Sequence, residues 1–395
     1  MKIAILGPIN TQILSSVIKK KDIKNLPKGN GASLVPNIIL GLLALGHHVT
    51  CISLTTEITD KIVFYKNKRL KIYYCPLRKR AFRFSDGKIG RASNFWYQEI
   101  KFMKQAILKD KPDIINAHWI YEYAYAAILS KKKYLITTHD IPHVILKYQT
   151  DLYRFVRFIM GFITLKIAKN ISAASNYAKI QTEKYTNTSI DVIPNCLRKE
   201  EFLLKIKKKK LNKKIKIVMI NQGFSDRKNV KIALQAFKEF NKNFPSSNLT
   251  LYGDDMERNN VCHQWAKKNN LTKNVIFVGF VPHAHLDKNL SKYDILLHTS
   301  LEETFGMIFI ESMIRGVPII ACNNGGAAPG IVKGNGLLVD VTNIKKITDG
   351  LNKYATNPQL WSKIRIKAYK NVKKKYSQKN VATKYLSLYK KILMK

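Results

Sequence analysis

Three carboxylates surround a glycine in the segment LEETFGMIFIESMIRGVPII, which spans residues 301–320. Glu302 and Glu303 precede Gly306, and Glu311 follows it inside an apolar stretch that is expected to be helical. Because glycine has no Cβ, the backbone at this point can approach a ligand closely. The first N–H groups of the helix would point at an anion, and the helix dipole would favour a negative charge there. The spacing therefore indicates an anion site with carboxylates on either side.

The ligand that such a site suits carries hydroxyl groups as well as phosphates. A carboxylate beside a hydroxyl group forms a charge-assisted hydrogen bond, which is about twice as strong as a neutral one. Glu303 would lie just before the anion and Glu311 beyond it, so a sugar at each end of a diphosphate fits best. That ligand is a nucleotide sugar. On spacing alone an alternative remains, in which the glutamates only cap and solvate a helix, and this is the role expected for Glu302.

Two histidines and an aspartate end apolar runs in the first half of the chain. His118 lies in the run 113–119, and His139 and Asp140 end the run 134–140. If these runs are parallel strands, their carboxyl ends meet at the sheet edge where ligands bind. Both histidines are candidates for substrate contacts, and the alternative for each is a hydrogen-bonded core residue. Asp140 is expected to orient one of them rather than to act as a base.

Short apolar runs alternate with helical patterns along the whole chain. Many runs are apolar at consecutive positions, which is typical of parallel strands buried on both faces. The alternation predicts an α/β fold with doubly wound parallel sheets. The expected strands are 2–7, 48–54, 71–77, 113–119, 134–140, 171–176, 191–195, 214–221, 248–253, 274–280, 294–300, 318–323 and 336–340.

Helix boundaries follow from capping residues. A helix is predicted from Pro36 to Gly46, because proline favours the first turn and glycine follows the last. Ser93 is expected to cap a helix that runs to about Lys109. The last twenty or so residues have the pattern of an amphipathic helix.

A chain of 395 residues is long enough for two or three domains. A lysine-dense stretch near 197–213 lacks a strand pattern and is interpreted as a linker between two Rossmann-like halves. We expect an N-terminal domain over 1–198, a basic linker over 199–213, a C-terminal domain over 214–372 and a terminal helix over 373–395. The terminal helix is expected to pack back on the N-terminal domain.

The segment that begins at Ser300 resembles the E-x7-E signature of retaining GT-B glycosyltransferases of the family 4 type. The matching residues are Ser300, Glu303, Phe305, Gly306, Glu311, Met313, Gly316, Pro318, Gly325 and Gly326. The resemblance extends over most of the chain, through PDIINAHW, THDIP, ISAASNYAK, DVIPNCLRKEEF, RKNVKIALQAF, LTLYGDDMER and NVIFVGFV. It implies a GT-B fold, in which two Rossmann-like domains face each other across a cleft. The N-terminal domain would take the acceptor and the C-terminal domain the nucleotide-sugar donor.

The resemblance also implies roles for individual residues. Glu311 would hold the ribose hydroxyls, and His118 and Glu303 would be the catalytic residues beside the transferred hexose. The other implied donor contacts are the backbone of Phe305, Gly306 and Met307 near the hexose, Arg227 and Lys228 at the diphosphate, Gly279, Phe280 and Val281 at the base, and Gly31 at the diphosphate from the other domain. His139, Asp140, Arg80 and Arg83 are possible acceptor-side or secondary contacts.

Three positions depart from the family pattern. Phe224 stands where the family usually has an arginine, so either Arg227 or Lys228 could be the residue that reaches the phosphates. Asn116 replaces the first histidine of an H-x-H motif and leaves His118 as the histidine of that strand. Cys196 replaces a usual glycine, which is expected to change a hinge turn and not the chemistry.

The reaction needs mainly positioning and charge. Cations and helix N-termini stabilise the negative charge that develops on the leaving diphosphate. Inversion would require a carboxylate base beside the acceptor hydroxyl, and no obvious candidate is found, while retention is implied by the resemblance. No D-x-D motif lies in a typical metal-bridging setting, and the GDD at 253–255 is interpreted as a structural or donor-side turn. No metal and no cofactor are expected.

The formal net charge is +43, from 69 Lys+Arg against 26 Asp+Glu. Nucleic acid, an anionic membrane face and anionic substrates are candidate partners, and a lysine-biased proteome is the alternative cause. A basic loop with interleaved aromatics contains Arg78, Lys79, Arg80, Phe82, Arg83, Phe84, Lys88 and Arg91. It suits a membrane surface or a lipid-diphosphate acceptor, it would equally suit RNA, and it could be a solvated loop. The segment 143–170 either lies in a membrane interface or covers the sheet.

These observations lead to one main hypothesis. The protein would move a hexose from a UDP- or GDP-type nucleotide sugar to a hydroxyl of a glycan or lipid-linked acceptor in surface-glycan assembly. The cysteines are scattered, and no run reaches the roughly 18 apolar residues of a membrane span. The short apolar run at the N-terminus is expected to be a buried strand and not a signal peptide. A cytoplasmic location, possibly peripheral on the inner membrane face, is therefore expected, without a nucleic-acid partner. The alternatives are a nucleic-acid-binding protein on a GT-B scaffold and a nucleotide-sugar epimerase.

Overall fold

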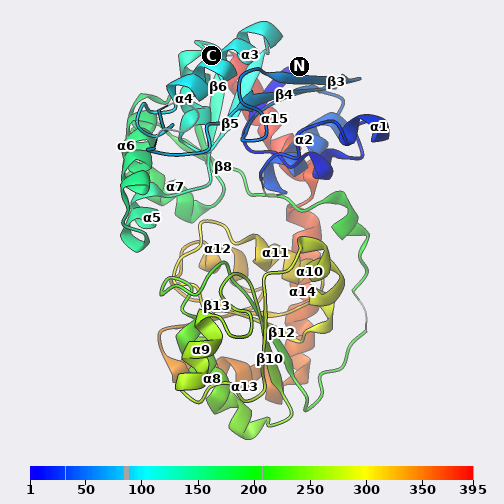
Figure 1. The fold of residues 1–395 in the computed structure, drawn as a ribbon. Coiled ribbons are helices and arrows are strands. Elements are labelled where there is room, and N and C mark those ends of the chain that lie inside the picture. Colours follow the sequence, from blue (N-terminus) through cyan, green and yellow to red (C-terminus); the bar gives the residue numbers. More distant parts are fainter. Residues whose placement is uncertain (32, 84–88, 207, 395) are drawn as a thin grey trace. The chain divides into compact units, whose positions relative to one another are not determined.

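The structure is a computed structural model that describes residues 1–31, 33–83, 89–206 and 208–394. The chain forms two compact units (Figure 1). The first contains Met1–Arg198 and Tyr376–Lys395, and the second contains Lys199–Lys375. Each unit is an α/β structure built on a parallel or mostly parallel sheet, as the apolar runs predicted.

The first unit is built on an eight-stranded sheet within the described residues, in the order β3-β4-β2-β1-β5-β6-β7-β8. All neighbouring strands are parallel except β3 and β4, which are antiparallel. The strands are β1 (Lys2–Leu6), β2 (His48–Thr55), β3 (Val63–Asn67), β4 (Leu70–Pro76), β5 (Ile114–His118), β6 (Tyr134–Thr138), β7 (Ile171–Ala173) and β8 (Ile190–Val192). The helices are α1 (Lys20–Ile23), α2 (Leu34–Ala44), α3 (Tyr97–Asp110), α4 (Glu122–Leu129), α5 (Pro142–Tyr148), α6 (Leu152–Ile167), α7 (Asn176–Glu183) and α15 (Gln378–Met394), with the 3₁₀ turn η1 (Thr11–Leu14).

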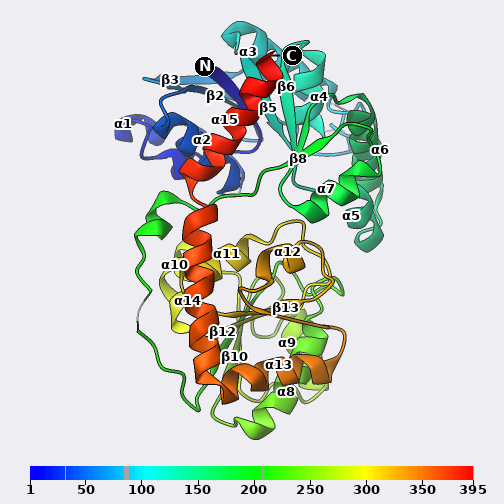
Figure 2. The same ribbon diagram turned by 180° about the vertical axis from the view of Figure 1, so that it is seen from behind.

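Helices cover both faces of this sheet, which explains why its central strands are apolar at consecutive positions. In β1, Ile3 and Ile5 face a core that includes α2 and α15, while Ala4 and Leu6 face the core that includes α3 and α4. Figure 2 shows α15 running beside α2 across the first unit. The C-terminal helix therefore completes one face of the N-terminal sheet.

Two local predictions in the first unit are wrong. Ser93 does not cap α3, which begins at Tyr97 after a left-handed Trp96 with φ of 55° and no side-chain cap. The fully buried indole of Trp96 fixes this helix start, so core packing overrides the capping preference. Strand β3 was not predicted, although residues 62–65 (IVFY) form a short apolar run, and it is an edge strand whose residues are mostly exposed or half-buried. The predicted helix end at Gly46 is confirmed by its φ of 88° just after α2.

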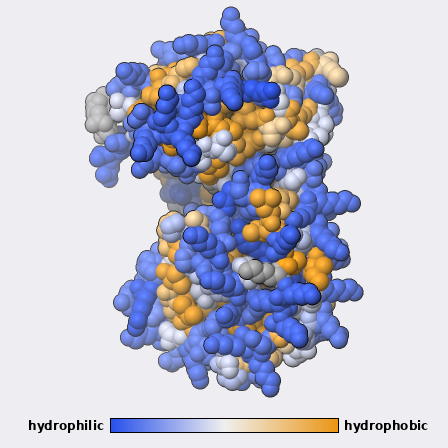
Figure 3. Space-filling view, turned by 90° about the vertical axis from the view of Figure 1, so that its right-hand side faces the viewer, coloured by the Kyte–Doolittle hydropathy of each residue, from blue (hydrophilic) through white to orange (hydrophobic). Residues whose placement is uncertain are grey.

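The segment 143–170 forms two helices rather than one. Helix α5 ends at Tyr148 and α6 starts after Asp151, whose carboxylate accepts a hydrogen bond from the backbone N–H of Arg154. Within the described residues, no helix combines the length and the apolar character that a membrane span requires. Hydrophilic residues dominate the face of the molecule in Figure 3, in keeping with the large excess of lysine.

The second unit is built on a six-stranded parallel sheet within the described residues, in the order β11-β10-β9-β12-β13-β14. The strands are β9 (Lys216–Ile220), β10 (Asn248–Tyr252), β11 (Val275–Gly279), β12 (Ile295–His298), β13 (Ile319–Cys322) and β14 (Leu337–Val339). The helices are α8 (Val230–Asn243), α9 (Val261–Lys268), α10 (His283–Asn289), α11 (Met307–Ile314), α12 (Ala328–Val332), α13 (Ile344–Thr356) and α14 (Pro358–Lys375), with the 3₁₀ turns η2 (Lys199–Leu203) and η3 (Leu290–Lys292).

The strand order of the second unit positions the candidate site. Strands β9 and β12 are neighbours and run parallel, with Ile217 beside Ile295 and Val218 beside Leu296. Their carboxyl ends therefore meet at one edge of the sheet, although the two strands are far apart in the sequence. The loops that leave this edge contain the residues that the sequence singled out.

Candidate active site

Two loops meet at the carboxyl edge of the second sheet, one after β9 and one after β12. The N–H of Leu301 donates to the carbonyl of Arg227 at 2.8 Å. The hydroxyl of Thr299 donates to the carbonyl of Lys228 at 3.1 Å. These backbone contacts hold the loops in register, so the side chains of Lys228 and Glu303 come together.

Lys228 and Glu303 form an ion pair with an Nζ–Oε1 distance of 2.5 Å. The lysine is buried and only 17% of the glutamate side chain is exposed. His298 Nε2 lies 3.5 Å from the same carboxylate oxygen. Burial would raise the pKa of Glu303, but the hydrogen bond with His298 and the charge of Lys228 outweigh burial and hold that pKa well below its ordinary value. Glu303 is therefore a carboxylate at neutral pH.

Glu302 is not the solvated residue that the sequence suggested. It is 5% exposed, and Arg227 Nη1 lies 3.1 Å from its Oε2. Its other oxygen, Oε1, is buried without a hydrogen-bond partner among the described residues. Burial raises the pKa of Glu302, opposed by the charge of Arg227. The expectation was wrong because Arg227, from the other loop, draws this carboxylate inward.

Glycines shape the backbone around Glu303. Gly306, at the N-terminus of α11, has a φ of 78°, and a Cβ there would lie 2.5 Å from the ring of Phe309. Gly326 has a φ of 64°, and a Cβ there would lie 2.3 Å from the carbonyl oxygen of Glu303. The N–H of Ala327 donates to that same carbonyl at 2.7 Å. The two glycine positions thus allow the close packing that fixes Glu303.

The residues beside this turn differ in exposure. Phe305 is buried, whereas Met307, the first residue of α11, is half-buried. Helix α11 has no acidic residue in its first turn. Its N-terminal N–H groups therefore keep the partial positive charge that favours an anion.

Glu311 contacts a histidine that sequence reasoning missed. His283 Nε2 lies 3.2 Å from Oε1 of Glu311, and His283 Nδ1 lies 3.3 Å from Oδ1 of Asp287. The hydrogen bonds with Asp287 and Glu311 raise the pKa of His283 to about 10. The imidazole is therefore a cation at neutral pH and bridges two carboxylates. Glu311 itself is 9% exposed.

Arg315 extends this network. Its Nη2 lies 2.7 Å from Asp287, and its Nη1 donates to Glu201 at 2.8 Å and to the carbonyl of Glu311 at 2.9 Å. Charges of opposite sign alternate from Glu311 to Glu201. A weak signal was present, since Arg315 stands four residues after Glu311 and so shares its helix face. The position of His283 gave no such signal, because the contact joins two separate elements.

The loop proposed for the nucleotide base leads directly into this network. Gly279 ends β11 with a φ of 83°, and a Cβ there would lie 2.5 Å from the Cβ of Glu257. Phe280 is 72% exposed and Val281 is half-buried. Two residues later His283 contacts Glu311, so the loop and the carboxylate are tied together.

The departure at Phe224 has a structural counterpart. Its N–H donates to Asp255 at 3.3 Å, and its ring lies 6.0 Å from that of Trp265. Asp255 belongs to the GDD sequence and therefore supports the turn after β9. The cations of this region are Arg227 and Lys228, and both already pair with glutamates.

In the first unit, His118 and His139 contact each other. His118 Nδ1 lies 2.8 Å from His139 Nε2, and the rings stack at 5.1 Å. Burial lowers the pKa of His118 well below its usual range, helped by repulsion from His139, and burial lowers the pKa of His139 to about 3. Both imidazoles are neutral at pH 7. Among the described residues, His118 Nε2 and His139 Nδ1 have no hydrogen-bond partner.

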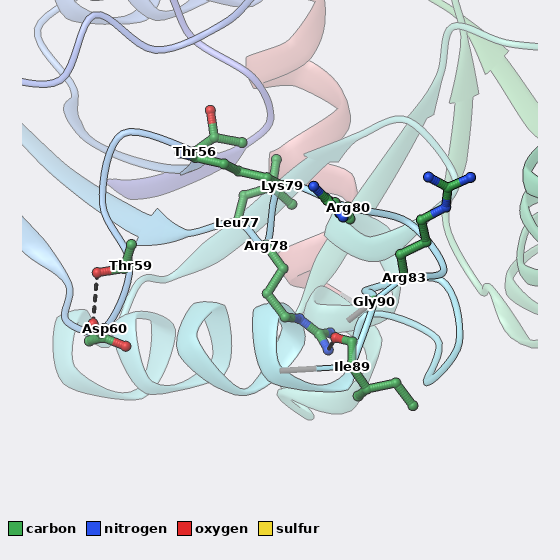
Figure 4. Close-up of a pocket in the computed structure, with 10 residues that line it drawn as sticks. All are labelled: Thr56, Thr59, Asp60, Leu77, Arg78, Lys79, Arg80, Arg83, Ile89 and Gly90. Carbon is green, nitrogen blue, oxygen red and sulfur yellow. Dashed lines mark hydrogen bonds between the residues drawn. The ribbon is translucent and has the colours of Figure 1, made fainter. Parts of the chain in front are cut away.

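The remaining predicted residues of the first unit have contacts of their own. The charge of Asp140 acts on Arg157, so this aspartate lies near that arginine. Gly31 approaches Pro8 so closely that a Cβ would lie 2.7 Å from the Pro8 carbonyl oxygen. Arg80 and Arg83 are exposed and line a pocket (Figure 4). Phe84 and Lys88 of the basic loop lie outside the described residues.

Comparison with known proteins covers nearly the whole chain. The family model described as Glycosyltransferase Family 4 matches residues 32–201, and the model described as Glycosyl transferases group 1 matches residues 201–374. The chain is 22% identical over 300 residues to N-acetyl-alpha-D-glucosaminyl L-malate synthase of Bacillus anthracis, covering 74% of this chain and 78% of that protein.

Two solved structures share the fold. Sucrose-phosphate synthase from Thermosynechococcus elongatus has a TM-score of 0.75 at 16% identity, with 100% of this chain and 99% of that chain covered. The protein HepE from Anabaena, in complex with UDP, has a TM-score of 0.68 at 15% identity, with 99% and 100% covered. These likenesses show that the two units form a GT-B fold.

Proposed function

Because the chain belongs to the GT-B glycosyltransferases of the family 4 type, we propose that it transfers a hexose from a nucleoside-diphosphate sugar with retention at the anomeric carbon. The acceptor is a hydroxyl of a glycan or lipid-linked molecule in surface-glycan assembly. The observation that carries the proposal is the pairing of Lys228 with Glu303, next to a helix N-terminus, in the same unit as the His283–Glu311 pair.

In this proposal the diphosphate lies between Lys228 and the first N–H groups of α11. The ammonium group has three donors, so it can bind a phosphate oxygen while it keeps or exchanges its contact with Glu303. Arg227 supplies a second cation on the same loop. Fixed positive groups of this kind stabilise the charge that develops on the leaving oxygen.

The two carboxylates then bind the sugars at either end of the diphosphate. Glu303, held as a carboxylate by Lys228 and His298, accepts hydrogen bonds from hexose hydroxyls. Glu311 accepts hydrogen bonds from the ribose hydroxyls, with His283 fixing its orientation. The loop of Gly279, Phe280 and Val281, in which Phe280 is exposed, takes the base. Charge-assisted hydrogen bonds are about twice as strong as neutral ones, which favours hydroxyl-rich ligands here.

The donor nucleotide is of the UDP or GDP type, and the reaction proceeds without a metal ion. Support for UDP comes from the structural likeness to HepE, which was solved with UDP bound. For the first unit we propose that His118 contacts the transferred sugar and that Gly31 lies near the diphosphate. The Nε2 atom of His118, which lacks a partner among the described residues, supports a contact to a hydroxyl.

Helix α6 supports a location on the cytoplasmic face of an anionic membrane. Its exposed apolar side chains are Leu152, Phe155, Phe162, Ile163 and Ile167. An outward face of a helix is ordinarily polar, whereas an apolar stripe with basic neighbours suits a lipid interface. Lys166 and Lys169 are exposed at the end of this stripe, and the net charge of +43 complements anionic lipids.

The first test is a thermal-shift screen of the full chain against UDP, GDP, ADP and CMP and their sugars. Ligands that bind the folded state raise the unfolding temperature by mass action. We expect one nucleoside diphosphate and its sugar to stabilise the protein, without added metal. Stabilisation by none of these ligands would contradict the proposal.

Product analysis with the cognate donor follows the screen. A glycosyltransferase consumes the donor faster when acceptor glycolipid extract is added, and the new linkage keeps the anomeric configuration of the donor. Conversion of the donor to an epimer in the absence of acceptor would instead identify an epimerase.

A further inference from the structure

The first unit has a pocket of about 420 Å³ outside the residues discussed for the donor. Its walls come from the loop after β2, with Thr56 and Thr59, and from the loop after β4, with Lys79, Arg80 and Arg83 (Figure 4). Ligand pockets typically have volumes from about 300 to 1,000 Å³. The pocket is therefore large enough for a small charged group with part of the molecule that carries it.

Arg78 lines the pocket, but its guanidinium group already pairs with a carboxylate and is not available to a ligand. Arg78 binds the fully buried Glu99 through two parallel contacts, Nε to Oε1 at 2.9 Å and Nη2 to Oε2 at 2.7 Å. Its Nη1 also donates to the carbonyl of Ile89 at 2.7 Å. Arg91 Nη1 donates to the carbonyls of Arg78 and Lys79 at 2.6 and 2.5 Å. The base of the loop is thereby fixed and the charge of Arg78 is neutralised by Glu99.

Three other cations of this wall have no such counter-charge among the residues that the structure describes. Lys79, Arg80 and Arg83 are exposed, and none pairs with a carboxylate of the described residues. The one acidic side chain in the lining, Asp60, accepts a hydrogen bond from Thr59 at 2.7 Å. The described lining residues thus have an excess of positive charge, on a loop whose base is held by Arg78 and Arg91, and Thr56 lines the same pocket.

Arginine recognises phosphate with two parallel N–H donors, which adds geometric specificity to the attraction of charge. We propose that this pocket binds a phosphate group of the acceptor, as a phosphomonoester or a diphosphate. The inference rests on the proposed function, because it assigns the phosphate to the molecule that receives the hexose. Arg80 and Arg83 donate hydrogen bonds to the phosphate oxygens, and Thr56 donates its hydroxyl. Arg78 and Arg91 fix the base of the loop.

The test is a calorimetric titration of inorganic pyrophosphate into the full chain in the presence of saturating cognate nucleoside diphosphate. Saturation occupies the donor site, so the remaining pyrophosphate binding reports on the pocket. The variant Arg80→Gln/Arg83→Gln is expected to weaken that binding by about tenfold or more, because two charge-assisted contacts are lost. The matched control Lys101→Gln/Lys109→Gln removes two exposed charges of α3 and is expected to stay within about twofold of the wild type.

Equal binding by the wild type and by Arg80→Gln/Arg83→Gln, or equal weakening in both double variants, would overturn the proposal. The nucleotide titration itself tests the donor site, so failure of the proposed function appears separately, as absent nucleotide binding. The source of the phosphate is then read from four probes: a soluble hexose 1-phosphate, vesicles that contain a polyprenyl phosphate, vesicles with phosphatidylserine, and a short RNA. Dependence on Arg80 and Arg83 with either phosphomonoester supports the proposal. The proposal would be overturned if Arg80 and Arg83 were needed for binding to phosphatidylserine vesicles or to a short RNA but not to hexose 1-phosphate or polyprenyl phosphate.

Discussion

The two units of this glycosyltransferase arrange their polar side chains in opposite ways. In the second unit each cation near the E-x7-E motif pairs with a carboxylate: Lys228 with Glu303, Arg227 with Glu302, and His283 with Glu311. In the first unit the buried histidines are neutral and contact each other. Of the cations that line its pocket, Arg78 pairs with Glu99, whereas Lys79, Arg80 and Arg83 have no carboxylate partner among the described residues.

The two kinds of polar side chain suit different parts of a substrate. A cation in an ion pair can exchange its carboxylate partner for a phosphate oxygen. A carboxylate in an ion pair can likewise accept hydrogen bonds from sugar hydroxyls. Neutral imidazoles cannot balance a phosphate, but they can hydrogen-bond a hydroxyl. In the proposed function, the charged part of the donor therefore binds the second unit and the histidines contact uncharged hydroxyl groups.

The largest effect is expected from breaking the Lys228–Glu303 ion pair of the proposed donor site. Lys228→Ala removes a cation from the leaving diphosphate and is expected to lower kcat by about 10²- to 10³-fold. Loss of one partner of a buried pair is also expected to cost roughly 3 kcal/mol in the free energy of unfolding. Steady-state kinetics and denaturant unfolding measure the two effects.

Lys231→Ala is the matched control for Lys228→Ala. Lys231 stands on the same segment and pairs with Asp226 at 3.2 Å, but both side chains are exposed. An exposed pair contributes at most about 1 kcal/mol. If Lys231→Ala lowered kcat as much as Lys228→Ala, the special role of the buried pair would be wrong.

A smaller effect is expected from Glu311→Gln. This change keeps the shape of the side chain but removes the charge-assisted hydrogen bonds to ribose, so affinity for the cognate nucleoside diphosphate is expected to fall by about 10- to 100-fold. The 2′,3′-dideoxy nucleotide lacks those hydroxyls, and its affinity is expected to be the same for both proteins. An equal loss for the two nucleotides would show that Glu311 does not bind the ribose.

Acid pH is expected to affect the two units differently. The pKa of His139 is about 3 in the folded protein and near 6.5 when unfolded, so the unfolded state binds more protons below pH 6.5. Stability of the first unit is therefore lost as the pH falls from 6.5 toward 3, by about 2 kcal/mol at pH 5 for this residue alone. Glu303 has a lowered pKa, so its contribution is kept down to the ordinary carboxyl pKa and lost only below it.

Hydrogen exchange at pH 7 and pH 5 measures this contrast. Peptides that cover residues 114–139 are expected to lose protection at pH 5, and peptides that cover 295–311 are expected to keep it. His139→Gln removes the titrating group and should reduce the loss in the first unit. Equal loss of protection in both sets of peptides would contradict the assignment of neutral histidines to the first unit alone.

The smallest effect is expected from His283, because nearly half of its side chain is exposed and solvent screens its charge. Its pKa is raised to about 10, so its stabilising charge is fully present below pH 6.5 and is lost as the pH rises through about 10. Nucleotide affinity of the wild type is expected to be constant from pH 7 to 9 and to fall a few-fold above pH 10. His283→Asn is expected to have the lower nucleotide affinity from pH 7 upward, without a further fall above pH 10. An equal fall above pH 10 in this variant would exclude the histidine as the cause of the fall.

Prediction from the sequence succeeded where local patterns decide the structure. Consecutive apolar residues identified the buried parallel strands, and glycine at Gly46 and Gly306 identified helix ends. It failed at β3, an edge strand in which Tyr65 is the one buried residue. It also failed at Ser93, because burial of Trp96 determines where that helix starts.

Within the candidate site, the missed features are contacts between distant segments. His283 contacts Glu311, and Arg227 contacts the buried Glu302. Both contacts form because the parallel sheet brings separate loops to one edge. No spacing rule within one segment reports such contacts. The roles of Glu303, Glu311 and His118 in binding and catalysis stay predictions that the experiments above test.

The central claim is that Lys228 and its loop bind the diphosphate of the donor. Calorimetric titration of the cognate nucleoside diphosphate and of the corresponding nucleoside into the wild type and Lys228→Ala tests it most directly. We predict that Lys228→Ala binds the diphosphate at least about tenfold more weakly and binds the nucleoside as the wild type does. Unchanged affinity for the diphosphate in Lys228→Ala would contradict the claim.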